Sequence, residues 1–221
     1  VLSMTRVPIV ELCQQALGHP VTVVHDVKAA AFGELVVGAG IGQADAAYLN
    51  LGTGVSIAFV FGWKVHHGST GTAGEVGHVV VEPHGELCNC GRRGCLETVA
   101  SGPAIARAAG RADGRLEGVA DAARAGDDRA IEAFRRAAEH LGRVLADFAM
   151  VMDVGLLMVG GGVSEAGAPL LEPLQASLDR HLEDVVESVK VVPAALGADS
   201  GVIGAAHWSR LVQSGGMAHT W

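Results

Sequence analysis

The chain has 221 residues, of which 49% are apolar and 18% are charged. This balance excludes a disordered chain and favours one domain, or one domain with a smaller appendage. The net charge is −8 at pH 7, and lysine and arginine form no long run, so we expect no nucleic acid to bind the chain itself. The apolar stretches fall far short of the roughly 18 residues of a membrane-spanning helix.

Because no apolar stretch is long enough to cross a bilayer, we expect no membrane contact. The N-terminal sequence lacks the charged segment and long apolar core of a secretory signal, which predicts a cytoplasmic protein with reduced cysteines. Glycine accounts for 31 of the 221 residues, about twice its usual share of about 7%. Such a composition favours tight turns and close backbone approaches, as in folds that bind phosphate.

The first elements in chain order are short. Helical spacing of apolar residues predicts a helix over 8–17, with Cys13 in the core. A β-branched run predicts a strand over 21–24, and an alanine-rich stretch predicts a helix over 27–37 that ends at Gly38. This order places a polar junction, His25 and Asp26, between a strand and a helix.

A sheet is predicted next. Apolar strands over 46–51 and 55–61 are joined by a glycine turn, which indicates a β-hairpin. A further strand is predicted over 76–82, before a segment rich in cysteine. From residue 96 onward the apolar period changes from two to 3.6, which indicates helices.

The second half of the chain alternates helices and strands. Apolar residues three and four apart predict a long amphipathic helix over about 128–152. A buried strand follows over 155–159, and Ser164 is a candidate cap for the next helix. A strand over 189–193 and a helix over about 200–211 complete an α/β layout.

Three cysteines and a histidine form the strongest chemical pattern. Cys88, Cys90 and Cys95 lie within eight residues, and His78 precedes them by ten. Three thiolates and one imidazole make a tetrahedral zinc set, and four protein ligands leave no open position, so we predict a structural zinc ion. His84 is an alternative fourth ligand, and the competing interpretation is buried or disulfide-linked cysteines, which a reducing compartment disfavours.

Polar residues beside this pattern are candidates for binding a ligand rich in hydroxyl groups. Glu75 and Glu97 flank the zinc segment, and carboxylates near an imidazole can accept hydrogen bonds from sugar hydroxyls, while a metal-bound His78 keeps one ring nitrogen free. For the two glutamates a solvated surface is the alternative. Asp26 could take the proton of a substrate hydroxyl during phosphoryl transfer, and its alternative is an ordinary helix cap.

Two glycine turns are candidates for binding a nucleotide. The first, Gly52, Thr53 and Gly54, follows a strand and can offer backbone N–H groups and a hydroxyl to a phosphate. The second, Gly160, Gly161 and Gly162, lies between a buried strand and a helix start, where an anion can approach closely. Either turn alone is weak evidence, because many such turns only reverse the chain.

In chain order the motifs HDVKAAAFGE, LNLGTG, GTAGEVGH, LCNCGRRGCLETVAS and MVGGGVS resemble those of the ROK family of sugar kinases and sugar-responsive repressors. The resemblance runs from about residue 8 to 210. It implies an actin-like, ribonuclease H-like α/β fold of two lobes, with a sugar bound in the cleft between them, and commonly a homodimer.

The resemblance also implies roles for individual residues. Asp26 matches the catalytic base of the kinases, and Glu75, His78 and Glu97 match the partners of the sugar hydroxyls. Residues 52–54 match a phosphate loop. His25, also expected to face the substrate, stands where the kinases usually carry Asn, so that the His-Asp pair looks more like the repressor branch.

Two further departures favour that branch. Residues 56–58, Ser-Ile-Ala, put bulk where we expect phosphate or nucleotide to need room. The kinases' first phosphate loop, an Asp-x-Gly-Gly-Thr string, is absent from the chain. We therefore expect residues 1–213 to form a partial ROK domain, mainly its C-terminal lobe, with a zinc loop over 78–97, a helical and C-terminal lobe over 96–213 and a disordered tail over 214–221.

Three functions follow as alternatives. The preferred hypothesis is the sugar-binding effector domain of a transcription regulator, in which a hexose or amino sugar shifts the arrangement of an attached DNA-binding module. The second is an ATP- and Mg²⁺-dependent sugar kinase resembling glucokinase. The third is a zinc-stabilised dimerisation fragment with no ligand of its own.

Overall fold

The computed structural model describes residues 7–183, 185 and 189–213. Its centre is a five-stranded mixed sheet with the strand order β3-β2-β1-β4-β5. The strands are β1 (Ala46–Leu51), β2 (Val55–Phe61), β3 (Lys64–Val65), β4 (Leu156–Gly160) and β5 (Lys190–Pro193). The predicted disordered tail, residues 214–221, lies outside the described residues.

The predicted hairpin is confirmed, and it meets a parallel layer. Strand β1 pairs antiparallel with β2 and parallel with β4, which in turn pairs parallel with β5. In the hairpin Leu51 pairs with Val55, so that the turn contains only Gly52, Thr53 and Gly54. The parallel pairs end with Asn50 of β1 beside Gly160 of β4. Both glycine turns therefore leave the same edge of the sheet.

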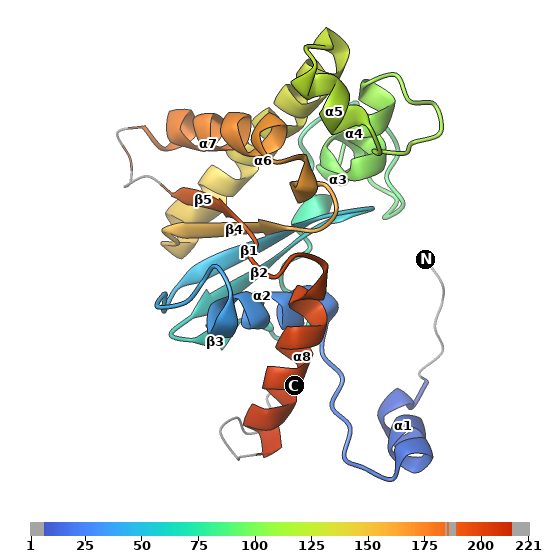
Figure 1. Ribbon diagram of the computed structural model, residues 1–221, viewed down its shortest axis with the longest axis vertical. Coiled ribbons are helices and arrows are strands. Elements are labelled where there is room, and N and C mark those ends of the chain that lie inside the picture. Colours follow the sequence, from blue (N-terminus) through green and yellow to red (C-terminus); the bar gives the residue numbers. More distant parts are fainter. Residues whose placement is uncertain (1–6, 184, 186–188, 214–221) are drawn as a thin grey trace.

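Helices cover both faces of the sheet (Figure 1). The α-helices are α1 (Ile9–Leu17), α2 (Asp26–Val37), α3 (Glu97–Ala100), α4 (Gly102–Ala108), α5 (Val119–Arg124), α6 (Asp128–Met152), α7 (Ala168–Leu182) and α8 (Ser200–Gln213). Short 3₁₀ turns are η1 (Val76–His78), η2 (Ser164–Ala166) and η3 (Gly197–Asp199). Within the described residues, no helix combines the length and the apolar character that a membrane crossing requires.

The strands divide their side chains between two cores because successive residues of a strand point to opposite faces. In β1, Leu49 and Leu51 join the core under α6 and α7, whereas Tyr48 joins the core under α2 and α8. Strand β4 alternates in the same way, with Val159 in the first core and Met158 in the second. The sheet is therefore buried on both faces, as a parallel α/β layer requires.

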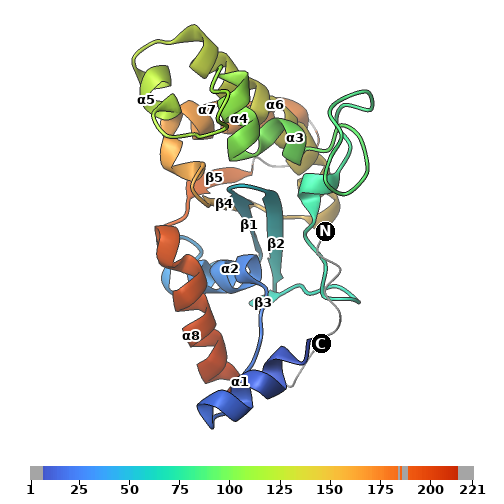
Figure 2. The same cartoon turned by 90° about the vertical axis from the view of Figure 1, so that its right-hand side faces the viewer.

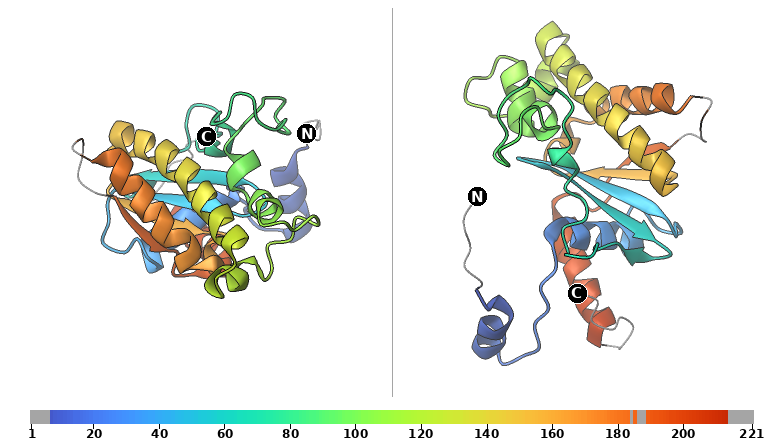
Figure 3. Two further views of the ribbon diagram at one scale, coloured as in Figure 1. Left: turned by 90° about the horizontal axis from the view of Figure 1, so that it is seen from above. Right: turned by 180° about the vertical axis from the view of Figure 1, so that it is seen from behind.

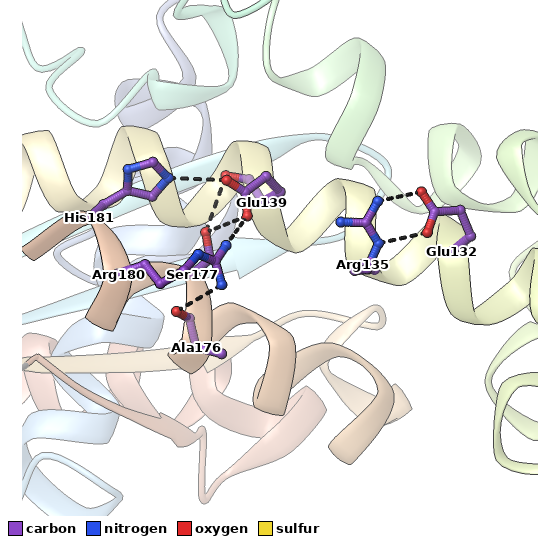
Figure 4. A network of polar contacts seen from close by, with 7 residues as sticks. All are labelled: Glu132, Arg135, Glu139, Ala176, Ser177, Arg180 and His181. Carbon is purple, nitrogen blue, oxygen red and sulfur yellow. Dashed lines mark hydrogen bonds and ion pairs between the residues drawn. The ribbon is translucent and has the colours of Figure 1, made fainter.

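Helices α6 and α7 lie side by side across one face (Figure 3). The predicted amphipathic helix is confirmed, and Phe134, Leu141 and Leu145 form its buried stripe. At its edge Glu139 accepts hydrogen bonds from Ser177 and Arg180 of α7 and lies 3.1 Å from the Nε2 of His181 (Figure 4). These polar contacts add to the apolar packing of α6 against α7.

Helices α2 and α8 pack closely on the other face. A Cβ at Gly204 would overlap the carbonyl oxygen of Ala29, and one at Gly33 would lie 2.7 Å from the Ser200 oxygen. Beside this contact Glu34, which is 0% exposed, accepts hydrogen bonds from the backbone N–H groups of Ala195 and Leu196 at 2.9 Å. One buried carboxylate thus joins α2 to the chain that enters α8.

Two predicted strands are wrong. Residues 21–24 have no strand partner among the described residues, and 76–82 fold into η1 and an irregular segment in which Val80 bridges Cys95. A β-branched sequence makes a strand only where a neighbouring strand supplies hydrogen bonds, and here glycines 74 and 77 instead press the backbone against β2.

Two smaller predictions also fail. Helix α1 forms as expected but buries none of its residues, so Cys13 is not in a core. In the views of Figures 1 and 2, α1 stands apart from the sheet. Ser164 does not cap α7: its hydroxyl donates to the Gly161 oxygen at 2.7 Å inside η2, and Gly167 precedes α7.

Candidate functional site

The loop after η1 brings four potential metal ligands together. One ligand atom from each of His78, Cys88, Cys90 and Cys95 lies within 4.8 Å of all the others. The Sγ atoms of Cys90 and Cys95 are 3.6 Å apart, as are Cys88 Sγ and His78 Nδ1. His84, the alternative fourth ligand, is not in this cluster.

These separations fit a tetrahedral ion. With Zn–S distances of about 2.3 Å, two thiolates on one zinc lie about 3.8 Å apart. A disulfide needs about 2.05 Å, so Cys90 and Cys95 are two free thiols. The cluster can therefore hold a metal ion, and the assignment to zinc stays a prediction.

The backbone of this loop brings the sulfur atoms of the three cysteines close together. The N–H of Cys88 donates to Arg92 O at 2.7 Å, and that of Gly91 donates to Cys88 O at 2.9 Å. Gly91 and Gly94 have φ values of +87° and +67°, which favour glycine. The Arg92 backbone lowers the pKa of Cys90 to about 6, whereas burial raises that of Cys95 to about 12. A bound cation would favour the thiolate at both.

The second ring nitrogen of His78 faces away from the cluster toward an acidic group. His78 Nε2 lies 3.9 Å from Glu75 Oε2. On the other side Glu97 Oε2 accepts the backbone N–H of Val55 at 3.2 Å, and a Cβ at Gly77 would overlap the Val55 oxygen. Glu97 thus contacts the first residue of β2, and the backbone between Glu75 and His78 packs against the same residue.

Asp26 begins α2 with its carboxylate exposed. The side chain is 88% exposed, and its Oδ1 accepts the Val27 N–H at 2.8 Å and lies 3.1 Å from His25 Nδ1. His25 occupies the N-cap position, and no side chain caps the helix. Asp26 is thus the first helical residue, not the cap that its position in the sequence allowed.

A cavity of about 200 Å³ opens beside Asp26. Its wall combines α2, β1, the turn after β4 and the start of α8, with residues Asp26, Val27, Ala30, Tyr48, Asn50, Gly161, Gly197, Ala198, Ser200 and Gly201. Burial raises the pKa of Tyr48, and a hydrogen bond with Ser200 opposes that shift. Glu75, His78 and Glu97 do not line this cavity.

A larger cavity of about 690 Å³ lies on the other side of the glycine turns. Gly52, Thr53 and Gly162 line it, together with Gly102, Pro103, Gly114, Arg115, Leu116, Glu117, Gly118, Ala120, Asp121, Arg124, Val163, Glu165 and Ala166. The contribution of 114–118 is not predicted from the sequence. The available signal was a polar break, flanked by glycines, between two helices. Such a break does not reveal which cavity it lines.

The glycine turns are less uniform than their sequences suggest. The N–H of Gly52 is used inside its own turn, where it donates to Gly54 O at 3.0 Å. Gly160 is buried in β4 against the Tyr48 hydroxyl, and Gly161 packs closely against the Leu51 carbonyl oxygen. Gly162 has open space around it and lines the larger cavity. Packing against Tyr48 accounts for Gly160 without a ligand.

The expected obstruction by residues 56–58 is wrong. These residues lie in β2, where Ile57 and Ala58 point into the two cores on opposite faces of the sheet. None of the three lines the larger cavity. Their bulk therefore gives no argument against a nucleotide.

Comparison with known proteins identifies the family. The model of the ROK family matches residues 2–211. The chain belongs to the ROK family. The glucokinase of Streptomyces coelicolor is 35% identical over 226 residues, which cover 92% of this chain and 71% of that protein.

Solved ROK structures show the same fold. A ROK glucokinase from Streptomyces griseus, in complex with glucose and AMPPNP, matches with a TM-score of 0.82 and 38% identity over 92% of this chain and 72% of that one. The ROK hexokinase from Thermus thermophilus gives 0.84 and 34%, over 94% and 71%. The predicted actin-like α/β sugar-kinase fold is thus confirmed.

The same comparisons overturn the preferred functional hypothesis. A ROK transcriptional regulator structure, a homologue of the Escherichia coli MLC protein, also matches with a TM-score of 0.81, but at 24% identity it shows the fold alone. The relatives at 34 to 38% identity are named glucokinase, hexokinase or N-acetylmannosamine kinase. The effector-domain interpretation, which depended on His25 and on residues 56–58, is therefore wrong, and the kinase alternative is favoured.

Proposed function

We propose that this chain forms the sugar- and nucleotide-binding part of an ATP-dependent hexose kinase, with Asp26 as the general base. The observation that carries the proposal is that adjacent glycines line adjacent cavities. Gly161 lines the cavity that contains Asp26, and Gly162 lines the larger one. A phosphoryl donor in the larger cavity would therefore lie next to the carboxylate that accepts the proton.

The sugar would lie between Asp26 and the metal cluster. Glu75, Glu97 and the Nε2 side of His78 supply carboxylate and imidazole groups that accept or donate hydrogen bonds to hydroxyls. An ion on the opposite nitrogen, Nδ1, would fix the orientation of the His78 ring. The role that we propose for zinc is thus to orient a sugar ligand while it holds the 78–97 loop together.

The nucleotide would occupy the 690 Å³ cavity. Thr53 lines the cavity, is exposed and offers a hydroxyl, and the open space at Gly162 lets a phosphate approach the backbone. Arg124 of α5 donates to the carbonyl oxygen of Ala166 at 2.7 Å, which joins two walls of the cavity. Mg²⁺, when bound with ATP, neutralises charge on the phosphates.

Proton transfer falls to Asp26. Its carboxylate is exposed and is oriented by the Val27 N–H, so it is available to a hydroxyl that enters from the cleft side. In phosphoryl transfer such a carboxylate accepts the proton of the attacking hydroxyl. His25, 3.1 Å away, helps to orient the same carboxylate.

Glucose is the first substrate to test, because glucokinases are among the relatives of this similarity, and N-acetylmannosamine is the second, because N-acetylmannosamine kinases are too. A cytoplasmic location and a homodimer remain predictions.

The deciding experiment measures ATP-dependent phosphorylation of glucose by the protein that carries this chain. Asp26→Asn should lower kcat by about 10²- to 10⁴-fold, the usual contribution of a general base, and leave glucose binding within about twofold because the amide keeps the side chain's shape. Asp147→Asn, at an exposed position of α6, is the matched control. Equal turnover in wild type and Asp26→Asn contradicts the proposal.

A further inference from the structure

Lys28 is a buried lysine whose position the proposed mechanism does not use. It lies in α2, two residues after Asp26, and is only 2% exposed. A buried ammonium group is costly unless hydrogen bonds replace its lost water. The hydrogen-bond partners of Lys28 therefore indicate which part of the fold it stabilises.

Both hydrogen-bond partners of Lys28 are backbone carbonyls of one irregular segment. The Nζ atom donates to the oxygens of His67 and Gly71, at 3.3 and 2.6 Å. The same His67 oxygen also accepts the N–H of Ala73 at 3.3 Å. The ammonium group thus binds the segment at His67, where the segment already folds back on itself.

The segment over 66–74 connects β3 to the candidate sugar-binding residues. Its ends are held by β2, since the His66 N–H donates to Phe59 O at 2.8 Å and the Ile57 N–H donates to Gly74 O at 2.9 Å. Its middle is held by Lys28 on α2. Glu75 follows the segment directly, and Figure 2 shows this part of the chain running past the edge of the sheet.

The charges agree with this arrangement. Burial lowers the pKa of Lys28, and the carboxylate of Glu75 opposes that shift. The ammonium therefore lies within electrostatic range of Glu75 while its protons bind the segment that precedes it. Among the described residues, Lys28 is the group that links the helix of Asp26 to the segment of Glu75 by side-chain hydrogen bonds.

We infer that Lys28 is a positioning residue of the sugar site, which fixes the 66–74 segment, and with it Glu75, relative to Asp26. This inference rests on the proposed function, because it assigns the sugar to the space between these carboxylates. Lys28 does not touch the reacting atoms in this account. Its loss should weaken sugar binding and leave the nucleotide cavity, which it does not line, unchanged.

The test compares Lys28→Met with Lys64→Met, a matched control at an exposed position of β3. Two hydrogen bonds from a charged donor are lost, so we expect hydrogen exchange of the 66–74 amides to become at least about tenfold faster. The glucose Kd should rise about tenfold or more, while the Kd of Mg-AMPPNP stays within about twofold. Lys28→Arg, which keeps a charged donor, should recover part of the glucose affinity.

The outcomes separate the two proposals. Unchanged exchange in a folded Lys28→Met protein overturns the inference, as does faster exchange with an unchanged glucose Kd. If Lys28→Met does not fold, Lys28→Arg and Lys28→Gln give the same comparison, and equal glucose affinity in both and in wild type overturns it. A wild-type protein that binds neither glucose nor AMPPNP contradicts the proposed function, and the exchange data then still decide whether Lys28 holds the segment.

Discussion

The segment over 66–97 and the cavity around Gly162 lie on the same sheet, yet different parts of the chain hold them in place. The 66–97 segment has little regular structure, and side chains hold it: the metal-binding cluster, Lys28 and Glu97. The cavity is bounded by the ends of strands and helices, and its shape depends on backbone approach at glycines. The first region should therefore fail when one of these functional groups is removed, and also when a carbon is added at Gly74 or Gly77, whereas in the second region added carbons are the sharper probe.

The largest effect is expected at the metal-binding cluster. Cys95 is fully buried, so Cys95→Ser removes a ligand where no other group can replace it. We expect loss of bound metal and a fall in unfolding free energy on the order of several kcal/mol, because metal binding and folding of such loops are coupled. Metal analysis and denaturant unfolding measure both, with Cys13→Ser on α1 as the control.

Full stability of metal-free Cys95→Ser protein would contradict a structural role for the ion. The 66–97 segment would then be held by Lys28 and Glu97 without help from the metal-binding cluster.

The next largest effect is expected at Glu34, which extends side-chain control to the wall of the Asp26 cavity. Its carboxylate accepts hydrogen bonds from Ala39, Ala195, Leu196 and Ser200. In Glu34→Gln one acceptor oxygen becomes a donor that faces other donors, so we expect a loss of about 3 kcal/mol in urea unfolding. The exposed Glu172→Gln should change stability by less than about 0.5 kcal/mol, and an equal effect in both variants would refute the account.

A matched pair of glycines tests the backbone-controlled region. Gly161 has a φ of +82°, and a Cβ there would overlap the Leu51 oxygen, whereas a Cβ at Gly162 meets nothing within 4 Å. Gly161→Ala should lower the unfolding free energy by about 2 kcal/mol. Gly162→Ala should leave the fold intact and weaken AMPPNP binding, because the methyl group enters the cavity.

Thermal unfolding and calorimetry of the two variants give the comparison. Equal stability of both would show that the turn relaxes and that its backbone does not set the cavity.

The smallest effect is expected at Glu139, whose hydrogen-bond partners all lie on α7. Partial burial raises its pKa, but the hydrogen bonds from His181 and Ser177 and the charge of Arg180 outweigh this and lower it below the ordinary 4.5. A lowered carboxyl pKa stabilises the protein above pH 4.5, and this contribution is lost as the pH falls through the folded-state pKa. Solvent screens the interaction between Glu139 and its partners. Glu139→Gln should therefore lower the unfolding free energy by only about 0.5 kcal/mol at pH 7.

Urea unfolding between pH 7 and pH 3 checks this sign. The wild type should lose more stability on acidification than Glu139→Gln, and parallel pH profiles would exclude the contribution.

Periodicity in the sequence was sufficient where a segment's partners are close in the chain. The stripe of Phe134, Leu141 and Leu145 predicted α6, and the two apolar runs joined by residues 52–54 predicted the hairpin. The metal ligand set was also accessible, because the types and spacing of the three cysteines carry the chemistry.

The failed predictions depend on distant parts of the chain. Residues 21–24 have strand-forming side chains, but a strand needs a neighbour, which no local pattern reveals. Residues 56–58 were placed in the nucleotide site because sequence alone does not show which way a strand's side chains point. The part of the cavity wall formed by 114–118 comes from a loop, whose position is set by α4, α5 and the distant turn at Gly162.

We propose that this chain has two adjacent sites, one for a hexose and one for an adenine nucleotide. The most direct test is the thermal unfolding of the protein with glucose, with Mg-AMPPNP and with both, since a ligand of the native state raises the unfolding temperature by mass action. The account predicts a rise with each ligand and a larger rise with both. The opposite result is a rise with glucose alone, no rise with Mg-AMPPNP alone, and no further rise when both are present. That result would contradict the presence of a nucleotide site.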